Sequence, residues 1–245
     1  MLEALLRRKR ELARNSERVT ELVCMKRETP NGISHQDYID AAAAINVPAP
    51  YLKAFATVES RDAGFDQHGR LTILYEPHRV HIATKGVLTG MKFQWSFKGR
   101  SLQIPLSYRG WKPRSRPIVT RPVRWHPYFE DPEGQWNMLA TAYELHPEVL
   151  RGVSWGAFQI LGKWAERLGY RDPLDMIRFM YKGEIHHLSV ALRYLKMTSP
   201  QAIPALRAGD FRTVARLYNG KGQVDDYTRR FKTAVRRAQR EFARV

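Results

Sequence analysis

The residue with the clearest chemical potential is Glu59, a carboxylate that ends the apolar stretch Ala54–Val58. A carboxyl group flanked by alanine, valine and phenylalanine is poorly solvated, so its neutral form is favoured and its pKa is expected to rise. A carboxylic acid with a raised pKa can serve as a general acid near neutral pH. The alternative is a glutamate that caps a helix or lies on the surface. Ser60 follows, and it either orients this carboxyl or bonds a nearby backbone carbonyl.

Helices and one short β-element are expected to position this carboxylate. Ser34 is typical of a helix start, because its hydroxyl can cap the free amides of the first turn. Prolines interrupt that helix, and a second helix is expected over residues 51–60. A turn at 66–70 and a strand at 71–75 follow, and they form the only hairpin-like unit that the sequence predicts. Glu59 is therefore expected near the C-terminal end of a helix, beside this unit.

The rest of the pattern is mostly helical. Apolar residues recur at helical spacing, with prolines near the predicted helix starts and glycines after several of the ends. The predicted helices cover residues 135–146, 154–168, 173–181, 184–197 and 227–242, with two short helices between residues 199 and 220.

Two basic segments differ from this pattern. Apolar residues at helical spacing before a turn at 29–32 predict that residues 1–33 form a basic helical N-terminal extension, packed on a main domain at 34–245. An arm that binds a polyanion is the alternative. Residues 92–126 carry nine Lys or Arg, no Asp or Glu, and four prolines that exclude a long helix. We expect an irregular basic and aromatic loop there, inserted in the main domain.

The charge balance predicts a polyanionic partner. The 245 residues include 41 Lys or Arg against 24 Asp or Glu, which gives a formal net charge of +17. Such a protein concentrates on nucleic acids or on the anionic polymers and phosphates of bacterial surfaces, and charge alone does not distinguish these partners. The single cysteine, Cys24, excludes an intramolecular disulfide and a cysteine-based zinc site.

The sequence predicts no export signal of its own. The apolar cluster at residues 2–6 is too short for a signal peptide, and no apolar run approaches the roughly 20 residues that span a bilayer. A protein made in the cytoplasm would then need another agent to reach a target outside it.

Three segments together resemble a known family. They are Thr57-Val58-Glu59-Ser60 with Gly64-Phe65, then Ser154-Trp155-Gly156-Ala157-Phe158-Gln159-Ile160, then Ala215-Arg216-Leu217-Tyr218-Asn219-Gly220. Their order resembles the lysozyme-like superfamily, which includes goose-type lysozymes and soluble lytic transglycosylases. With Ile73-Leu74-Tyr75-Glu76-Pro77-His78, the chain resembles most the N-acetylmuramidase domain of phage endolysins, over residues 35–240.

The resemblance implies an α+β fold that is predominantly α-helical and lysozyme-like, with a small β-hairpin beside the active-site cleft. It implies a peptidoglycan hydrolase in which Glu59 protonates the oxygen leaving from N-acetylmuramic acid. The substrate is then the glycan strand, with no cofactor, no metal and no obligate protein partner. Delivery to the wall would be of the holin type.

A second carboxylate usually completes such a site, about 5 Å away for retention or about 6.5–9.5 Å for inversion. The candidates are Glu76, Asp62 and Asp66, and the resemblance favours Glu76. A structural Glu76, bonded to His78 or to a backbone amide, is the alternative.

The motifs also imply a set of substrate-binding residues. Gly156 would let the backbone approach a sugar and Gln159 would offer an amide to an acetamido group, although glycines here equally permit close helix packing. Tyr218 and Asn219 would lie near the acid, or Asn219 would simply end a helix. The full expected set is Ser60, Tyr75, Ser154, Trp155, Gly156, Gln159, Tyr218 and Asn219.

Two other functions remain open from the sequence. A lytic transglycosylase would use the same glutamate as acid and then base, closing an anhydro ring on the sugar. A nucleic-acid-binding protein would use the aromatic and basic 92–126 segment for stacking and phosphate contacts. The latter is disfavoured because it leaves Glu59 and the two later motifs unexplained.

Overall fold

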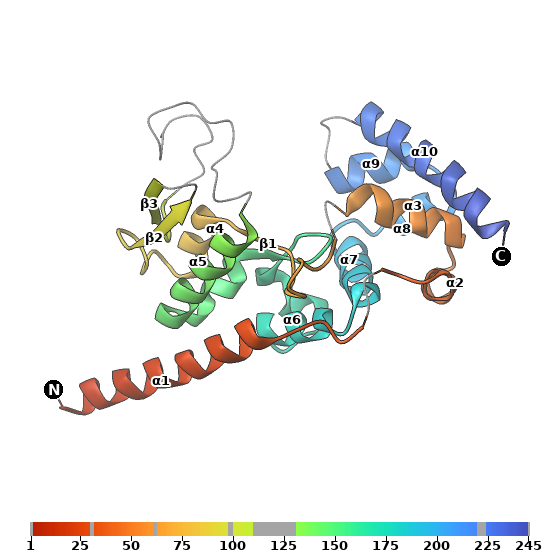
Figure 1. Cartoon of the computed structure of the whole chain (residues 1–245). Helices are drawn as coiled ribbons and strands as arrows, with labels where there is room; N and C mark the ends of the chain where they lie inside the picture. The colour runs from red at the N-terminus through yellow and green to blue at the C-terminus, as the bar shows by residue number, and fades with distance from the viewer. Residues whose placement is uncertain are drawn as a thin grey trace.

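The computed structural model describes residues 2–29, 32–60, 63–97, 100–109, 131–219 and 224–244. The described chain is mainly helical, with two small antiparallel sheets. Figure 1 shows a helical lobe on one side and a lobe with the β-elements on the other, with α6 and α7 between them. None of the described helices is both long and apolar enough to cross a membrane.

The helical lobe is built around α3. Ser34 and Asp37 form a capping box before α2 (His35–Ala44), which confirms the predicted helix start. Helix α3 (Ala49–Glu59) begins after Pro48 and ends at Glu59, as the sequence predicts. It packs against α8 (Ala202–Arg207), α9 (Phe211–Asn219) and α10 (Val224–Phe242). The catalytic candidate therefore ends a helix that is enclosed on several sides.

A three-stranded antiparallel sheet joins the two lobes. Its order is β1 (Ile73–Tyr75), β4 (Val153–Trp155) and β5 (Ile160–Leu161). Leu71 forms an antiparallel bridge with Phe65 across the turn at 66–70, which confirms the predicted hairpin-like unit, and Ile73–Tyr75 continues into a pairing with the distant strand β4. The helix predicted over 154–168 is wrong, because the chain turns between β4 and β5 through left-handed backbone at Gly156 (φ +69°) and Gln159 (φ +52°).

The remaining part of 154–168 is two short 3₁₀ segments, Gly162–Trp164 and Glu166–Leu168. They end at Gly169, which has left-handed backbone and closes the segment as expected. A short apolar run does not distinguish a buried helix from a buried strand by its period. This ambiguity explains the wrong prediction.

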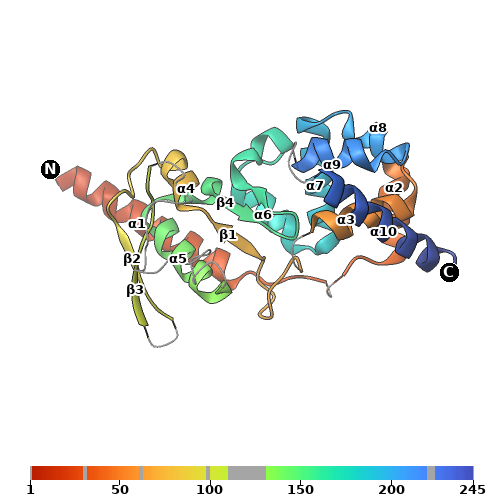
Figure 2. The ribbon, with the colours of Figure 1, turned by 90° about the horizontal axis from the view of Figure 1, so that it is seen from above.

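The basic segment contains a regular hairpin. Strands β2 (Lys92–Phe97) and β3 (Arg100–Pro105) pair antiparallel, which corrects the irregular loop predicted for 92–126. Strand β3 ends at Pro105, the first proline of the segment, so no proline interrupts the strands before that residue. Figure 2 shows this hairpin beside α5 (Pro132–Leu145) and far from α10. Residues 98–99 and 110–126 lie outside the described residues.

The N-terminal helix α1 (Leu2–Cys24) runs along the β-containing lobe. Leu22 is fully buried, and the Asn15 side chain donates a hydrogen bond to the Glu144 carbonyl (3.2 Å). The backbone amide of Glu28 donates to the Tyr181 carbonyl (2.9 Å). The C-terminal part of this segment is therefore packed on the rest of the protein.

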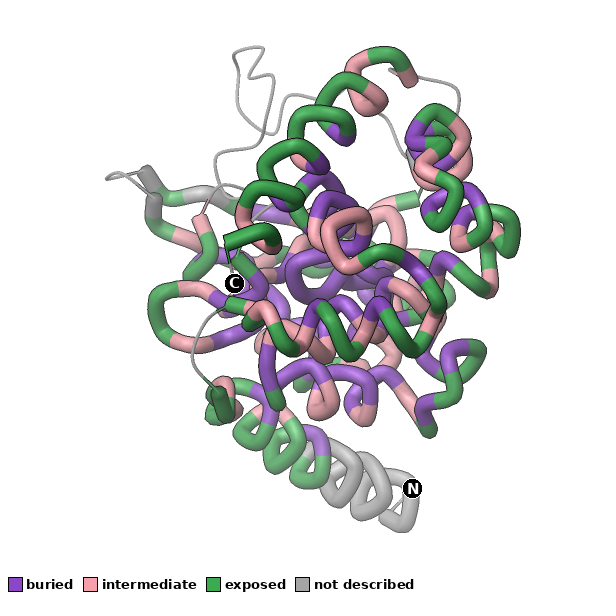
Figure 3. The backbone as a smooth tube through the Cα atoms, turned by 90° about the vertical axis from the view of Figure 1, so that its right-hand side faces the viewer, coloured by how far each residue is buried: buried purple, intermediate pink, exposed green. Residues whose placement is uncertain are grey.

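Two further elements were not predicted from the sequence. Helix α4 (Pro77–Ala83) comes after β1, and a 3₁₀ helix (Pro147–Gly152) comes before β4. Helices α6 (Pro173–Tyr181) and α7 (Glu184–Thr198) confirm the helices predicted over 173–181 and 184–197. Figure 3 shows that buried residues run through the centre of the molecule, while the outward face of α10 is exposed.

Candidate active site

A cleft of about 580 Å³ contains Glu59 at the end of α3 and Glu76 just after β1. Its walls come from α3, the β1–β4–β5 sheet, the 3₁₀ segment at 162–164, and helices α7, α9 and α10. The residues that line the cleft include Glu59, Ser60, Leu74, Glu76, Arg79, Ser154, Gln159, Lys163, Trp164, Tyr194, Tyr218, Tyr227 and Arg230.

Glu59 is only 7% exposed although it lines the cleft. Val58 and Phe158 are among the residues that line the cleft with it. Burial of a carboxyl group disfavours its charged form. This placement is the one that a proton donor to a bound substrate requires.

Glu76 is held by three polar neighbours. The Ser154 hydroxyl donates to one carboxylate oxygen (3.2 Å), and Arg79 Nε lies 3.3 Å from the other. His78 Nε2 is 3.8 Å from that second oxygen. Burial lowers the pKa of His78 and outweighs the opposing effect of the Glu76 charge. His78 is therefore neutral at pH 7, and Arg79 supplies the positive charge beside Glu76.

Asp66, another candidate for the second carboxylate, does not line this cleft. Asp66 pairs with Arg70 at 2.9 Å, and both side chains are only 9% exposed. Asp66 lines a neighbouring depression of about 800 Å³ that meets the cleft at Leu74 and Gln159. Asp62 lies outside the described residues.

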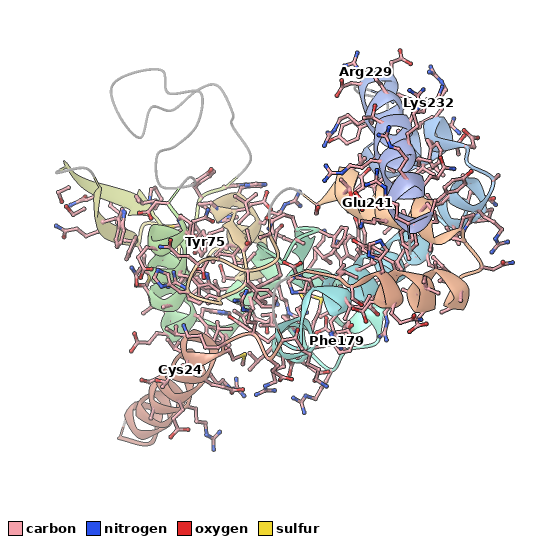
Figure 4. All side chains as sticks on the ribbon, turned by 45° about the vertical axis from the view of Figure 1, so that its right-hand side comes forward. Cys24, Tyr75, Phe179, Arg229, Lys232 and Glu241 are labelled. Carbon is pink, nitrogen blue, oxygen red and sulfur yellow. The ribbon has the colours of Figure 1, made fainter. Side chains whose placement is uncertain are left out.

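Four of the expected substrate-binding residues line the cleft, namely Ser60, Ser154, Gln159 and Tyr218. Two others do not. Tyr75 is fully buried and donates its hydroxyl to the Leu106 carbonyl (2.8 Å), and Figure 4 shows it inside the β-containing lobe. Trp155 is also fully buried, with its indole N–H on the Leu150 carbonyl (3.1 Å). Both belong to the core.

The last two expected residues have other positions. Gly156 faces the ring of His187, where an added Cβ would lie 2.8 Å from Nδ1. Gly162 lies against the Leu150 carbonyl, which an added Cβ would meet at 2.0 Å. Both glycines therefore allow close packing, the alternative that the sequence left open. Asn219 ends α9, and its side chain is outside the described residues.

Several residues that line the cleft were not predicted from the sequence. Trp164, Tyr194 and Tyr227 line it with Lys163 and Arg230. These residues come from a 3₁₀ segment, α7 and α10, which are far apart along the chain. Their helical spacing fits ordinary packing, so no local signal assigned them to a site.

The first turns of α7 fix the loop after Glu59. Glu184 accepts hydrogen bonds from the amides of Gly64 and Gly32, each at 2.9 Å. His187, one turn later, accepts from the Ala157 amide (3.2 Å), and its other ring nitrogen is 3.0 Å from the Met180 carbonyl. The segment 63–65 after Glu59 and the segment 156–159, which contributes Gln159 to the cleft, are thus positioned by one helix.

His187 should make folding stability depend on pH. Burial lowers its pKa to about 4, below the usual value of about 6.5. As the pH falls below 6.5 the unfolded chain takes up a proton that the folded state does not, so stability falls. We expect a loss of about 2 kcal/mol between pH 7 and pH 5 from this residue. His78 and His186 add in the same direction, because burial lowers the pKa of each.

Chemical denaturation at pH 5, 6 and 7 measures this effect. His187→Gln should be less stable than wild type at pH 7 and should lose much less stability on going to pH 5. His68→Gln, at an exposed histidine, is the control and should keep the wild-type slope. An unchanged slope in His187→Gln would contradict the assignment.

Within the described part of the chain, no group of three or more His, Cys, Asp or Glu side chains could hold a metal ion. His187 has both ring nitrogens engaged with backbone groups.

Comparison with known proteins identifies the family. The family model for muramidases, described as N-acetylmuramidase, matches residues 48–239. Among solved structures, the crystal structure of the Burkholderia AP3 phage endolysin is similar, with 26% sequence identity and a TM-score of 0.66. The match covers 88% of this chain and 74% of that one. A search of the curated proteins gave no match. The chain therefore belongs to the N-acetylmuramidase family, enzymes that cleave the glycan of peptidoglycan.

Proposed function

We propose that this cleft hydrolyses the bond between N-acetylmuramic acid and N-acetylglucosamine, with Glu59 as the general acid. The observation that carries the proposal is a carboxyl group only 7% exposed that still lines a sugar-sized cleft. Similarity to the AP3 phage endolysin supports a role in bacterial lysis. The substrate is the peptidoglycan glycan strand.

In the proposed step, Glu59 donates its proton to the glycosidic oxygen as the bond from C1 of N-acetylmuramic acid breaks. The oxygen leaves as a hydroxyl of N-acetylglucosamine. A water molecule adds to C1, and its proton passes to a carboxylate. Glu76 is the candidate for that carboxylate, and its negative charge also stabilises the positive charge that develops on the sugar.

A lytic transglycosylase is the second candidate. The observation that favours it is the engagement of both Glu76 oxygens, one by Ser154 and the other by Arg79. With both of its oxygens occupied by protein partners, Glu76 would not position a water molecule, and the C6 hydroxyl of the same sugar would then attack C1. Glu59 would act as the acid and then as the base.

Mass spectrometry of the products from purified Gram-negative peptidoglycan separates the two reactions. Hydrolysis gives reducing N-acetylmuramic acid ends, and these are the products that we expect. Anhydro ends, one water lighter, would establish the transglycosylase. No soluble products from the wild-type protein would contradict both, and a salt-sensitive complex with nucleic acid would then favour the binding protein.

The basic surface of α10 is the candidate for attraction to anionic phosphates of the outer membrane. Arg229 and Lys232 project from this helix into solvent in Figure 4, and Arg236 is also exposed. The apolar face is already used. Phe231, Val235 and Ala238 are buried, so insertion of this helix into a membrane would require it to leave the fold. We therefore propose electrostatic attraction only.

Removing part of this charge tests the attraction. Lys232→Gln/Arg236→Gln should lower lysis of intact Gram-negative cells about threefold at low salt, and the difference should shrink as salt screens the charges. Arg14→Gln/Lys196→Gln removes two exposed cations elsewhere and is the matched control. Equal rates for the two double variants, measured by turbidity, would contradict a specific role of α10.

A further inference from the structure

The lining of the cleft combines aromatic rings with positive charge. Trp164, Tyr194, Tyr218 and Tyr227 line it, and Lys163 and Arg230 lie among them. An aromatic face offers an apolar surface to the flat side of a sugar ring. While the peptide stem occupies the lactyl carboxyl group of N-acetylmuramic acid, the sugars of the glycan carry no charge that would require two cations. The cations therefore need a separate explanation.

The charges in the cleft are not all compensated. Arg79 pairs with Glu76 at 3.3 Å. Within the described residues, Lys163 and Arg230 have no carboxylate within 4.0 Å. Both side chains belong to exposed residues, so each remains available to a ligand.

Both cations are held in position by neighbours other than acids. The Arg230 guanidinium donates to the Val58 carbonyl (3.1 Å) and lies 4.8 Å from the centre of the Tyr227 ring. Lys163 Nζ lies 4.5 Å from the centre of the Trp164 ring. Because Val58 directly precedes Glu59, Arg230 is anchored next to the proposed acid. A planar guanidinium fixed in this way can still bind a carboxylate with its free N–H groups.

The anionic part of this substrate is the peptide stem that the glycan strand carries. Each stem is attached to N-acetylmuramic acid through its lactyl group and carries free carboxylates. We propose that Lys163 and Arg230 bind carboxylates of the stem, so that the enzyme prefers glycan strands that bear peptides. This inference rests on the proposed muramidase function and names the acidic peptide as a second recognised part of the substrate.

Two soluble substrates test the proposal: glycan oligomers with their stems, and the same oligomers after an amidase has removed the stems and each freed lactyl carboxyl group has been capped as an amide. Wild type should cleave the stem-bearing strands with a kcat/KM about tenfold higher, the size expected for one or two partly exposed ion pairs. Lys163→Gln/Arg230→Gln should lose this preference, so that its kcat/KM is about the same on the two substrates, whatever the change in its rate on the stem-free strands. Lys163→Arg/Arg230→Lys, which keeps both charges, should recover most of the preference.

The stem-free rate is the internal control for folding and for the position of Glu59. Arg14→Gln/Lys196→Gln, with the same charge loss outside the cleft, should keep the wild-type preference. An equal loss on both substrates in Lys163→Gln/Arg230→Gln, or equal wild-type rates on both, would overturn the stem proposal alone. Failure of wild type to cleave either substrate would overturn the muramidase function and this proposal with it.

Discussion

Glu59→Gln should fold like the wild-type protein and lose at least about a thousandfold in activity on purified peptidoglycan. The amide has the size and polarity of the carboxyl group, but it cannot donate a proton to the leaving oxygen. Loss of a positioned general acid typically costs 10²–10⁴-fold in rate. Among the described residues, no other buried acid lines the cleft and could replace Glu59. The initial rate of dye release from labelled peptidoglycan measures the effect.

Two controls make this result specific to catalysis. Thermal unfolding of Glu59→Gln should stay within a few degrees of wild type, because a buried polar side chain replaces one of similar shape. Glu17→Gln, at an exposed position on α1, should keep full activity. A Glu59→Gln protein that is folded and retains more than a tenth of the wild-type rate would contradict the role of Glu59.

Glu76→Gln should lower activity about a hundredfold with little change in KM. The substitution keeps an acceptor for the Ser154 hydroxyl but removes the negative charge beside the sugar and the base for water. The charge of Arg79 then remains unpaired in the cleft, which further disfavours a positive charge on the sugar. Steady-state kinetics on soluble glycan oligomers separate kcat from KM.

The alternative role of Glu76 predicts a different pattern. If this residue only ties β1 and α4 to Ser154, Glu76→Gln loses stability and keeps its kcat. Arg79→Gln, which leaves the carboxylate and Ser154 in place, is the companion variant. A wild-type kcat in Glu76→Gln would remove this carboxylate from the proposed reaction and would favour a mechanism with Glu59 alone.

The local signals predicted the helical part of the fold well. Ser34 caps α2, Glu59 ends α3, and α6 and α7 lie where the apolar period placed them. These features depend on caps, prolines and helical spacing, which act within a few residues of one another. The helix predicted over 154–168 was wrong because the strands there are two or three residues long, and the first of them, β4, pairs with β1 about 80 residues away.

Strand geometry explains which predicted site residues reach the cleft. Side chains alternate between the two faces of a strand. Leu74 and Ser154 are opposite each other in the β1–β4 pair and line the cleft, whereas Tyr75 and Trp155 point to the core. A motif that spans consecutive strand residues therefore contributes only every second residue to a site. Once the strands are known, this alternation shows which of the predicted residues on β1 and β4 face the cleft.

Long-range assembly accounts for what the sequence could not indicate. Lys163, Trp164, Tyr194, Tyr227 and Arg230 meet only because α7, α10 and a 3₁₀ segment converge at the cleft. No short motif encodes this meeting. The same holds for Glu184 and His187, whose contacts with the loop after Glu59 cross more than 100 residues of chain.

The most direct test of the account is to compare new N-acetylmuramic acid ends on purified peptidoglycan treated with wild type and with Glu59→Gln, after showing that both proteins bind it equally in a pelleting assay. The account predicts new ends with wild type and none above background with the variant, at equal binding. Ends formed at the wild-type rate by Glu59→Gln, or new ends on N-acetylglucosamine instead, would contradict it.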